Sequence, residues 1–348
     1  MTNKILVLGF FGFGNNQLDG QTIKTRNIYG LLERKKQQYG YKLSSFDTQI
    51  FKSSKIQIFK MFVQILSTDI LIYVAAHNNL KYLFPIIYFI TKIKKTPIHY
   101  VVVGGWLSEF IETKPIHIKL LRKIKGIYPQ TKVLTEELQE KYHFENVFQL
   151  NNFRLNNSSI ETTSLTKNSF TKLKIVFMAR VHPMKGVDIL FNLANRLKSL
   201  NIENISLDIY GPIFTEYLQE FEEKINSHDL VFYKGVLQPN EIHSVLREYD
   251  LMLFPTKYYT EGFPGSILDA YISGIPVIAT SWRYAEEFIE HDVCGIITKF
   301  DDECDFIKTT LELLMDPDKI VRMKKAALIQ ARKYSVDTAW SVLKEKIL

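Results

Sequence analysis

Two acidic residues, Glu261 and Asp269, stand eight positions apart on either side of a Gly-Phe-Pro-Gly-Ser turn. The apolar run before them, residues 251–256, predicts a buried strand, and Pro264 suits the first turn of a helix that Gly274 ends. Glu261 is then expected on the loop and Asp269 about one turn into the helix. A helix N-terminus binds phosphate through its backbone N–H groups. The pattern therefore predicts a ligand with phosphate in its middle and hydroxyl groups at both ends, such as a nucleotide sugar.

Two cations follow another predicted strand in the same half of the chain. Residues 174–180 form an apolar run that ends in Arg180, and Lys185 stands at the start of the next predicted helix. At the carboxyl end of a sheet these two side chains can clamp a diphosphate. The alternative for each charged residue taken alone is an ordinary solvated position, with Asp269 favoured by the helix dipole.

A glycine-rich loop follows the first predicted strand, residues 4–10. It superficially resembles a dinucleotide-binding loop, but polar residues rather than a helix follow Gly14, so a nicotinamide site is the weaker interpretation. The stronger interpretation is a loop that approaches the ligand across a cleft, through Gly14, Asp19 and Gly20.

Strand-like apolar runs alternate with helical segments along the chain, which is typical of parallel sheets covered on both faces. The first half predicts strands at 4–10, 42–48, 69–76, 98–105, 131–135 and 146–152. The second half predicts them at 174–180, 205–211, 230–235, 251–256, 276–280 and 295–298. We therefore predict an α/β protein with two doubly wound, Rossmann-like domains that face a central cleft, where ligands bind beyond the strand ends.

The segment 154–172 is rich in Ser, Thr and Asn and lacks apolar periodicity, so it is predicted to be a linker. The domains are then residues 1–153 and 173–335. A C-terminal helix is expected over 336–348, packing back toward the first domain.

Composition narrows the class of protein. The chain has 348 residues, of which 46% are hydrophobic and 23% charged, and these values exclude a disordered protein. Its two cysteines cannot form a disulfide framework, so a reducing cytosol is expected. No Cys/His cluster has zinc spacing, and the Asp-Pro-Asp sequence at 316–318 is predicted to be a turn, so no metal is expected.

No apolar run approaches the roughly 20 residues of a membrane span, and the N-terminal apolar run is predicted to be a strand rather than a signal peptide.

Charge is distributed unevenly. Residues 1–150 contain 21 Lys and Arg against 10 Asp and Glu, a net charge of +11, whereas the remainder has 23 against 27, a net charge of −4. Such asymmetry indicates that the first half meets an anionic surface or ligand. No nucleic-acid-binding module is recognisable, so nucleic acid is not expected as a partner.

Residues 80–95 and 116–126 place apolar side chains beside Lys and Arg at helical spacing, as interfacial helices do, although core helices with solvated outer faces are an equal alternative.

The acidic turn, "TEGFPGSILDA", and the strand end, "ARVHPMKG", together resemble the GT-B glycosyltransferases of family 4, also called glycosyl transferases group 1, of the bacterial surface-polysaccharide type. Residues 131–153 are similar to the family's segment before the linker. The resemblance covers the second domain closely and the first domain loosely. It implies a retaining enzyme that needs no metal, no cofactor and no enzymatic nucleophile, with the first domain on the acceptor side.

The resemblance also implies roles for individual residues. Glu261 would contact the donor sugar and Asp269 the ribose, while Arg180 and Lys185 would neutralise the diphosphate as it leaves. Backbone groups at the start of the helix would hold phosphate. The donor-binding residues implied at the turn are Gly262, Phe263, Pro264, Gly265, Ser266, Ile267 and Asp269. The family's second acid is usually Glu, and Trp106 stands near the place where many members have a histidine.

The expected function is transfer of a hexose-type sugar from a nucleotide-diphosphate sugar to a saccharide acceptor, lipid-linked, in the synthesis of a surface polysaccharide or glycoconjugate. The expected location is the cytoplasm, with peripheral binding to the inner face of the cell membrane. Two alternatives stay open: a nucleotide-sugar epimerase of the same fold, and a non-catalytic module that binds a sugar nucleotide or glycan.

Overall fold

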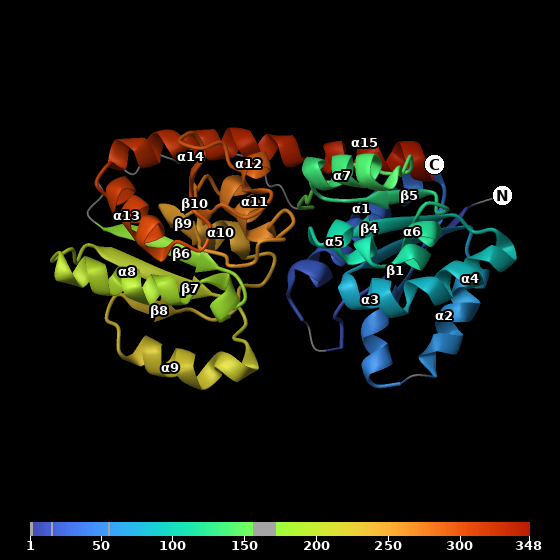
Figure 1. Ribbon diagram of the computed structural model, residues 1–348, viewed down its shortest axis with the longest axis horizontal. Helices are drawn as coiled ribbons and strands as arrows, with labels where there is room; N and C mark the ends of the chain where they lie inside the picture. The colour runs from blue at the N-terminus through green and yellow to red at the C-terminus, as the bar shows by residue number, and fades with distance from the viewer. Residues whose placement is uncertain (1–2, 15–16, 55, 156–171) are drawn as a thin grey trace. The chain divides into compact units, whose positions relative to one another are not determined.

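The computed structural model describes residues 3–14, 17–54, 56–155 and 172–348 (Figure 1). The chain forms two compact units, of which the first is Met1–Leu155 with Ser335–Leu348 and the second is Asn156–Tyr334. Most of the predicted linker, residues 156–171, lies outside the described residues.

The first unit is built on a five-stranded parallel sheet in the order β2-β1-β3-β4-β5. Its strands are β1 (Lys4–Gly9), β2 (Lys42–Asp47), β3 (Ile70–Ala75), β4 (Ile98–Val102) and β5 (Gly126–Tyr128). The strands β1, β3 and β4 are buried over nearly their whole length, because their apolar runs are covered on both faces.

Helices lie on both faces of this sheet. They are α1 (Gly20–Tyr39), α2 (Gln57–Leu66), α3 (His77–Tyr82), α4 (Phe84–Lys94), α5 (Leu107–Glu112), α6 (Pro115–Leu121), α7 (Lys132–Tyr142) and α15 (Val336–Ile347). Ile72 and Val101 pack in one core with α1 and α15. Tyr73 and Tyr100 instead contact the ring of Phe84 on α4, at centroid distances of 6.2 and 6.3 Å. Because successive side chains of a strand point to opposite faces, α4 lies on the face opposite α1 and α15.

The second unit has a six-stranded parallel sheet in the order β11-β10-β9-β6-β7-β8. Its strands are β6 (Leu173–Met178), β7 (Ile205–Tyr210), β8 (Val231–Tyr233), β9 (Leu251–Phe254), β10 (Val277–Thr280) and β11 (Gly295–Thr298). Its helices are α8 (Asp188–Ser199), α9 (Leu218–Asn226), α10 (Ile242–Leu246), α11 (Gly265–Ile272), α12 (Ala285–Phe288), α13 (Glu303–Leu314) and α14 (Pro317–Ala331). Strand order reverses between β6 and β9, which makes this pair the switch point of a doubly wound sheet. The predicted α/β class with two Rossmann-like units is confirmed.

The predicted strand at 131–135 is wrong, because these residues begin helix α7. Thr131 caps the helix through its side-chain hydroxyl, which accepts the backbone N–H of Leu134 at 3.2 Å. Leu134, Leu138 and Tyr142 then repeat at four-residue spacing and are buried on one side of the helix.

The predicted strand at 146–152 is also wrong. The segment runs beside β5 through a single parallel bridge from Val147 to Ile127 and a few backbone hydrogen bonds, but it does not form a regular strand. The fifth strand is β5, which begins at Gly126, where the helical pattern of 116–126 was expected to end. Helix α6 stops at Leu121, and this early stop leaves room for the short strand.

A buried histidine in the first unit links stability to pH. His99 of β4 has its Nδ1 2.8 Å from the hydroxyl oxygen of Tyr128. Burial, with Lys125 nearby, lowers the pKa of His99 to about 4. The unfolded chain, in which the histidine pKa is about 6.5, therefore binds a proton more readily than the folded protein does.

Folding stability is consequently expected to fall as the pH drops from about 6.5 toward 4, with His99 accounting for about 2 kcal/mol at pH 5. Urea unfolding of the wild type and of His99→Gln at neutral pH and near pH 5 measures this contribution. The variant is expected to lose less stability between the two conditions. An equal loss in both proteins would contradict a neutral buried imidazole.

Candidate active site

The predicted site residues of the second unit follow β6 and β9, the two strands at the switch point. Gly186 lies in the loop that follows β6 and has a φ of 72°. A Cβ at this position would lie 1.8 Å from the carbonyl oxygen of Pro255, the residue that follows β9. The carbonyl of Met184 accepts the backbone N–H of Lys257 at 2.9 Å. The two loops therefore touch backbone to backbone, and only glycine fits at position 186.

This contact brings together two predicted residues, Lys185 and Glu261. Lys185 Nζ forms an ion pair with Oε1 of Glu261, and both side chains are largely buried. The hydroxyl of Thr256 donates to the same oxygen at 3.3 Å, and the carbonyl of Thr256 accepts a hydrogen bond from Thr280 of β10 at 2.6 Å. Lys185 Nζ also lies 4.7 Å from the ring centroid of Tyr258. Groups at the carboxyl ends of three neighbouring strands thus hold one carboxylate and one ammonium together.

A histidine that no sequence pattern indicated lies in the same loop. Nδ1 of His182 accepts the backbone N–H of Met184 at 2.9 Å, and its ring packs on Phe214 with centroids 4.4 Å apart. Because Nδ1 is an acceptor, the neutral ring carries its proton on Nε2. Burial, with Arg180 and Lys185 nearby, lowers the pKa of His182. The loop thus combines a neutral imidazole with two cations, of which Arg180 is exposed.

Asp269 is buried in the middle of α11, and its partner was not foreseen either. Nε2 of His243, on α10, lies 3.0 Å from Oδ1 of Asp269. His243 is a single histidine in a five-residue helix, so spacing alone gave no indication of it. The pair forms because α10 packs against α11.

The turn before α11 is held by packing. Gly262, Phe263 and Pro264 are buried, and the Phe263 ring is stacked on Phe288 with centroids 4.1 Å apart and an interplanar angle of 3°. Phe263 also contacts Tyr334, at 4.5 Å. Pro264 is the N-cap residue and supplies no side-chain hydrogen bond. Phe263 thus fixes where the helix starts. The first turn consists of Gly265, Ser266 and Ile267.

The predicted loop residues of the first unit follow β1. The backbone N–H of Gly14 donates to Oε1 of Gln49 at 2.9 Å. Asp19 caps α1, which begins at Gly20, because its carboxylate accepts the N–H of Thr22 while the Thr22 hydroxyl accepts the N–H of Asp19, both at 2.9 Å. This capping box gives the Asp19 carboxylate a structural role.

Over the described ranges, no group of three or more His, Cys, Asp or Glu could hold a metal ion. Asp316, in the Asp-Pro-Asp sequence, caps α14 by accepting the N–H of Lys319 at 2.9 Å. Within the same ranges no helix has both the length and the apolar character that crossing a membrane requires.

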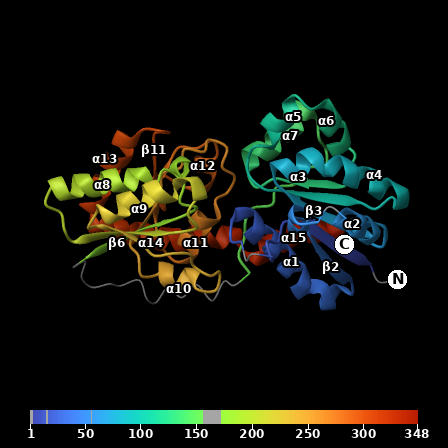
Figure 2. The same cartoon turned by 90° about the horizontal axis from the view of Figure 1, so that it is seen from below.

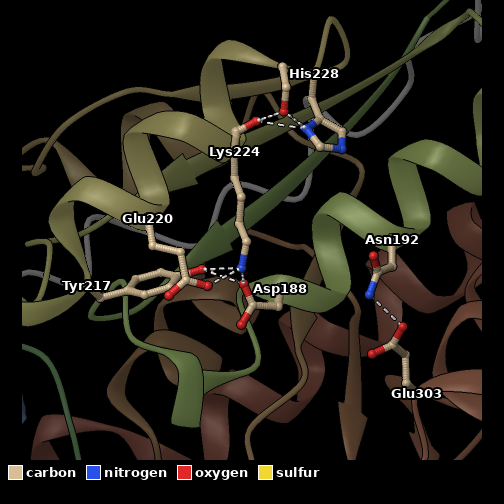
Figure 3. Close-up of polar contacts among 8 residues, drawn as sticks. Asp188, Asn192, Tyr217, Glu220, Lys224, His228 and Glu303 are labelled. Carbon is tan, nitrogen blue, oxygen red and sulfur yellow. Dashed lines mark hydrogen bonds and ion pairs between the residues drawn. The ribbon is translucent and has the colours of Figure 1, made fainter.

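A polar cluster holds the helix that follows the β6 loop (Figure 3). Asp188, the first residue of α8, accepts hydrogen bonds from Lys224 Nζ at 2.7 Å and from the Tyr217 hydroxyl. One turn later, Asn192 donates to Glu303 of α13 at 2.7 Å. These contacts fix α8 against α9 and α13, and with it the end of the loop that carries the cations.

Comparisons with known proteins agree with this geometry. Residues 163–330, most of the second unit, match the family model for glycosyl transferases group 1. A stretch of 131 residues is 28% identical to an uncharacterized 41.2 kDa protein in the cps region of Klebsiella pneumoniae. That stretch is 38% of this chain and spans about a third, 34%, of the Klebsiella protein.

Solved structures extend the likeness to the whole fold. The crystal structure of Anabaena Alr3699/HepE in complex with UDP and glucose has a TM-score of 0.74 at 15% identity, over 99% of this chain and 98% of that one. A mutant of S. aureus TarM in complex with fondaparinux, alpha-GlcNAc-glycerol and UDP has a TM-score of 0.63 at 22% identity, over 79% and 54% of the two chains. These neighbours are GT-B glycosyltransferases, and the fold of this protein is GT-B.

The backbone contact at Gly186 can be tested by adding a methyl group. Gly186→Ala is expected to lower the free energy of unfolding by at least about 3 kcal/mol, because the Cβ must displace the Pro255 carbonyl. Gly235→Ala is the matched control, since Gly235 has a φ of 82° with open space around it and is expected to lose only about 1–2 kcal/mol. Urea unfolding compares the two variants. Equal losses would contradict the close approach of the loops.

Proposed function

We propose that the protein is a retaining, metal-independent glycosyltransferase that moves a hexose-type sugar from a nucleotide-diphosphate sugar to a saccharide acceptor. The observation that carries this proposal is the pairing of Lys185 with Glu261 at the strand ends, four residues before α11 begins. The match of residues 163–330 to glycosyl transferases group 1 supports it. The Anabaena protein HepE was crystallised with UDP and with UDP-glucose, which makes UDP the first nucleotide to test.

On this proposal each charged residue contacts a different part of the donor. Glu261 accepts hydrogen bonds from hydroxyl groups of the sugar. Lys185, Arg180 and the N-terminus of α11 stabilise the negative charge that develops on the leaving diphosphate, which is the part a metal ion would otherwise play. Asp269, held by His243, accepts hydrogen bonds from the ribose hydroxyls. The anomeric carbon breaks its bond to the diphosphate oxygen and forms one to the acceptor oxygen on the same face of the sugar, with no enzymatic nucleophile. The acceptor hydroxyl gives its proton to the departing diphosphate oxygen.

The acceptor in this proposal is a lipid-linked saccharide, used in making a surface polysaccharide or glycoconjugate at the inner face of the cell membrane. The support is the net charge of +11 on residues 1–150, which favours an anionic partner for the first unit. The name of the Klebsiella relative, which places that protein in a cps region, agrees with such a role.

Replacing Lys185 tests the proposed stabilisation of the leaving group. Lys185→Met is expected to lower kcat by roughly 30- to 1000-fold, equivalent to about 2–4 kcal/mol of barrier. Lys257→Met is the control, because Lys257 lies in the neighbouring loop and pairs with the exposed Asp301 at 3.4 Å; its kcat should stay within about twofold of the wild type. Release of UDP from UDP-sugars measures the rate, and NMR of the product assigns its anomeric configuration.

Several outcomes would contradict the proposal. EDTA that abolished the wild-type rate would overturn metal independence, and an inverted product would overturn retention. Turnover of the donor to an epimer without any acceptor would favour the epimerase. Nucleotide binding with no product from any acceptor would favour a non-catalytic module.

Replacing His243 and Asp269 tests the ribose contact. Asp269→Asn is expected to weaken UDP binding about tenfold but to leave the binding of 2′,3′-dideoxy-UDP nearly unchanged, because the weakened hydrogen bonds are those to the ribose hydroxyls, which this analogue lacks. His243→Ala should act in the same direction, whereas His243→Gln, which retains an N–H donor near the Nε2 position, should restore most of the affinity. Isothermal titration calorimetry measures the affinities of the wild type and the three variants for both nucleotides. Equal losses for both nucleotides would show that the pair only supports the fold.

A further inference from the structure

Helices α2, α4 and α6 form one layer on the first unit's sheet. Helix α4 contacts both α2 and α6, and Figures 1 and 2 both show α2 beside α4. Phe84 of α4 packs on the sheet through Tyr73 and on α6 through His117, with ring centroids 6.2 and 6.5 Å apart. The sides of these helices that face away from the sheet therefore form a common surface, which we name the outer helix face.

Large apolar side chains are exposed along the outer helix face at helical spacing. On α4 the side chains of Phe84, Ile87 and Tyr88 are buried, whereas Phe89 and Ile93 are 65% and 68% exposed. These two residues are four positions apart, so they share one side of the helix. With Ile86, exposed to a lesser degree, they form a stripe that the fold leaves uncovered.

Helices α2 and α6 continue this surface. Phe59 of α2 is 71% exposed, and Ile56 and Val63 lie three positions before it and four positions after it, both exposed. On α6, Ile116 is exposed as well. A surface of several large apolar side chains on adjacent helices is uncommon on a protein that has no partner there.

The charged residues within the three helices themselves are all lysines, namely Lys60 on α2, Lys92 and Lys94 on α4, and Lys119 on α6. Residues 48–108 contain seven lysines and one acidic residue, Asp69. Asp69 is paired with Lys94 at 2.7 Å, so it neutralises a cation of α4. Lys60 of α2 and Lys92 of α4 are exposed beside the apolar stripes. Apolar residues flanked by lysines on one helix side are typical of helices that lie in the headgroup region of a membrane.

A basic hollow lies on α6 and the turn that follows it. It has a volume of about 430 Å³ and is lined by Pro115, Ile118, Lys119, Arg122 and Lys123. The lysines and Arg122 are exposed. The hollow therefore joins apolar contacts to cations that suit the phosphate of a lipid headgroup.

We propose that the outer helix face docks the protein on an anionic lipid bilayer, with Phe59, Phe89 and Ile93 inserted among the acyl chains and the lysines at the headgroups. A second copy of the chain fits this surface poorly, because a two-fold interface would bring two lysine-bearing surfaces of the same charge together. The proposal extends that of a lipid-linked acceptor, but its test is binding alone, so the two can fail separately.

Flotation of the full-length protein with vesicles tests this surface. The wild type is expected to float with phosphatidylcholine vesicles that contain phosphatidylglycerol at low salt, and to be released by about 0.5 M NaCl. The double variant Phe89→Ser/Ile93→Ser should bind at least about tenfold more weakly, because apolar insertion is lost. Lys92→Gln should weaken binding about fivefold, the effect of one cation near an anionic surface.

The matched control is Ile329→Ser on α14, since Ile329 is also exposed, at 61%, but lies in the second unit. Its binding should equal that of the wild type. Three outcomes would overturn the proposal: no flotation of the wild type, equal loss in the control, or flotation unchanged in the double variant. A dimer by analytical ultracentrifugation that the double variant abolishes, together with no flotation, would assign the face to self-association instead.

Discussion

The close approach of Gly186 to the carbonyl of Pro255 is the constraint on which the second unit's site depends. The strands β6 and β9 are parallel neighbours at the switch point, so their carboxyl ends lie at the same edge of the sheet. With no side chain at position 186, the two loops come within backbone contact, which sets Lys185 opposite Glu261. The packing of Phe263 on Phe288 then fixes where α11 begins relative to both residues.

The Lys185–Glu261 pair is expected to contribute little to stability, and the role we propose for it is in catalysis. Ion pairs taken out of water lose in desolvation much of what they gain from attraction, so such a pair is a weak stabiliser of the fold. In a site that excludes water, however, charges held at fixed positions need no reorganisation when a reaction creates new charge. The hydroxyl of Thr256, the Tyr258 ring and the partial burial of both side chains serve this fixed arrangement.

Sequence patterns predicted the second unit well because its strands are continuous apolar runs bounded by glycine, proline or charge. The positions of Arg180, Lys185 and Glu261 after strand ends could be predicted for the same reason, since each follows such a run. The prediction of a strand at 131–135 was wrong because Thr131 is a helix cap. Thr and Val in a short run favour a strand prediction, so the cap could not be told from a strand residue. His243 could not be predicted at all, because its contact with Asp269 depends on how α10 packs on α11.

The uneven charge of the chain is a feature that the proposed donor site does not explain. The charges proposed for that site are few, and Arg180, Lys185, Glu261 and Asp269 all lie in the second unit. Residues 1–150 have more than twice as many cations as acidic residues, so at least eleven cations there have no acidic counterpart within the same segment. Unbalanced charge of one sign destabilises a compact state through self-repulsion. The same segment leaves phenylalanine and isoleucine side chains in water, which forgoes the favourable free energy of burying them. Charge self-repulsion and exposed apolar side chains thus occur on the same surface. A partner that is both anionic and apolar would relieve both, and a lipid bilayer has both properties.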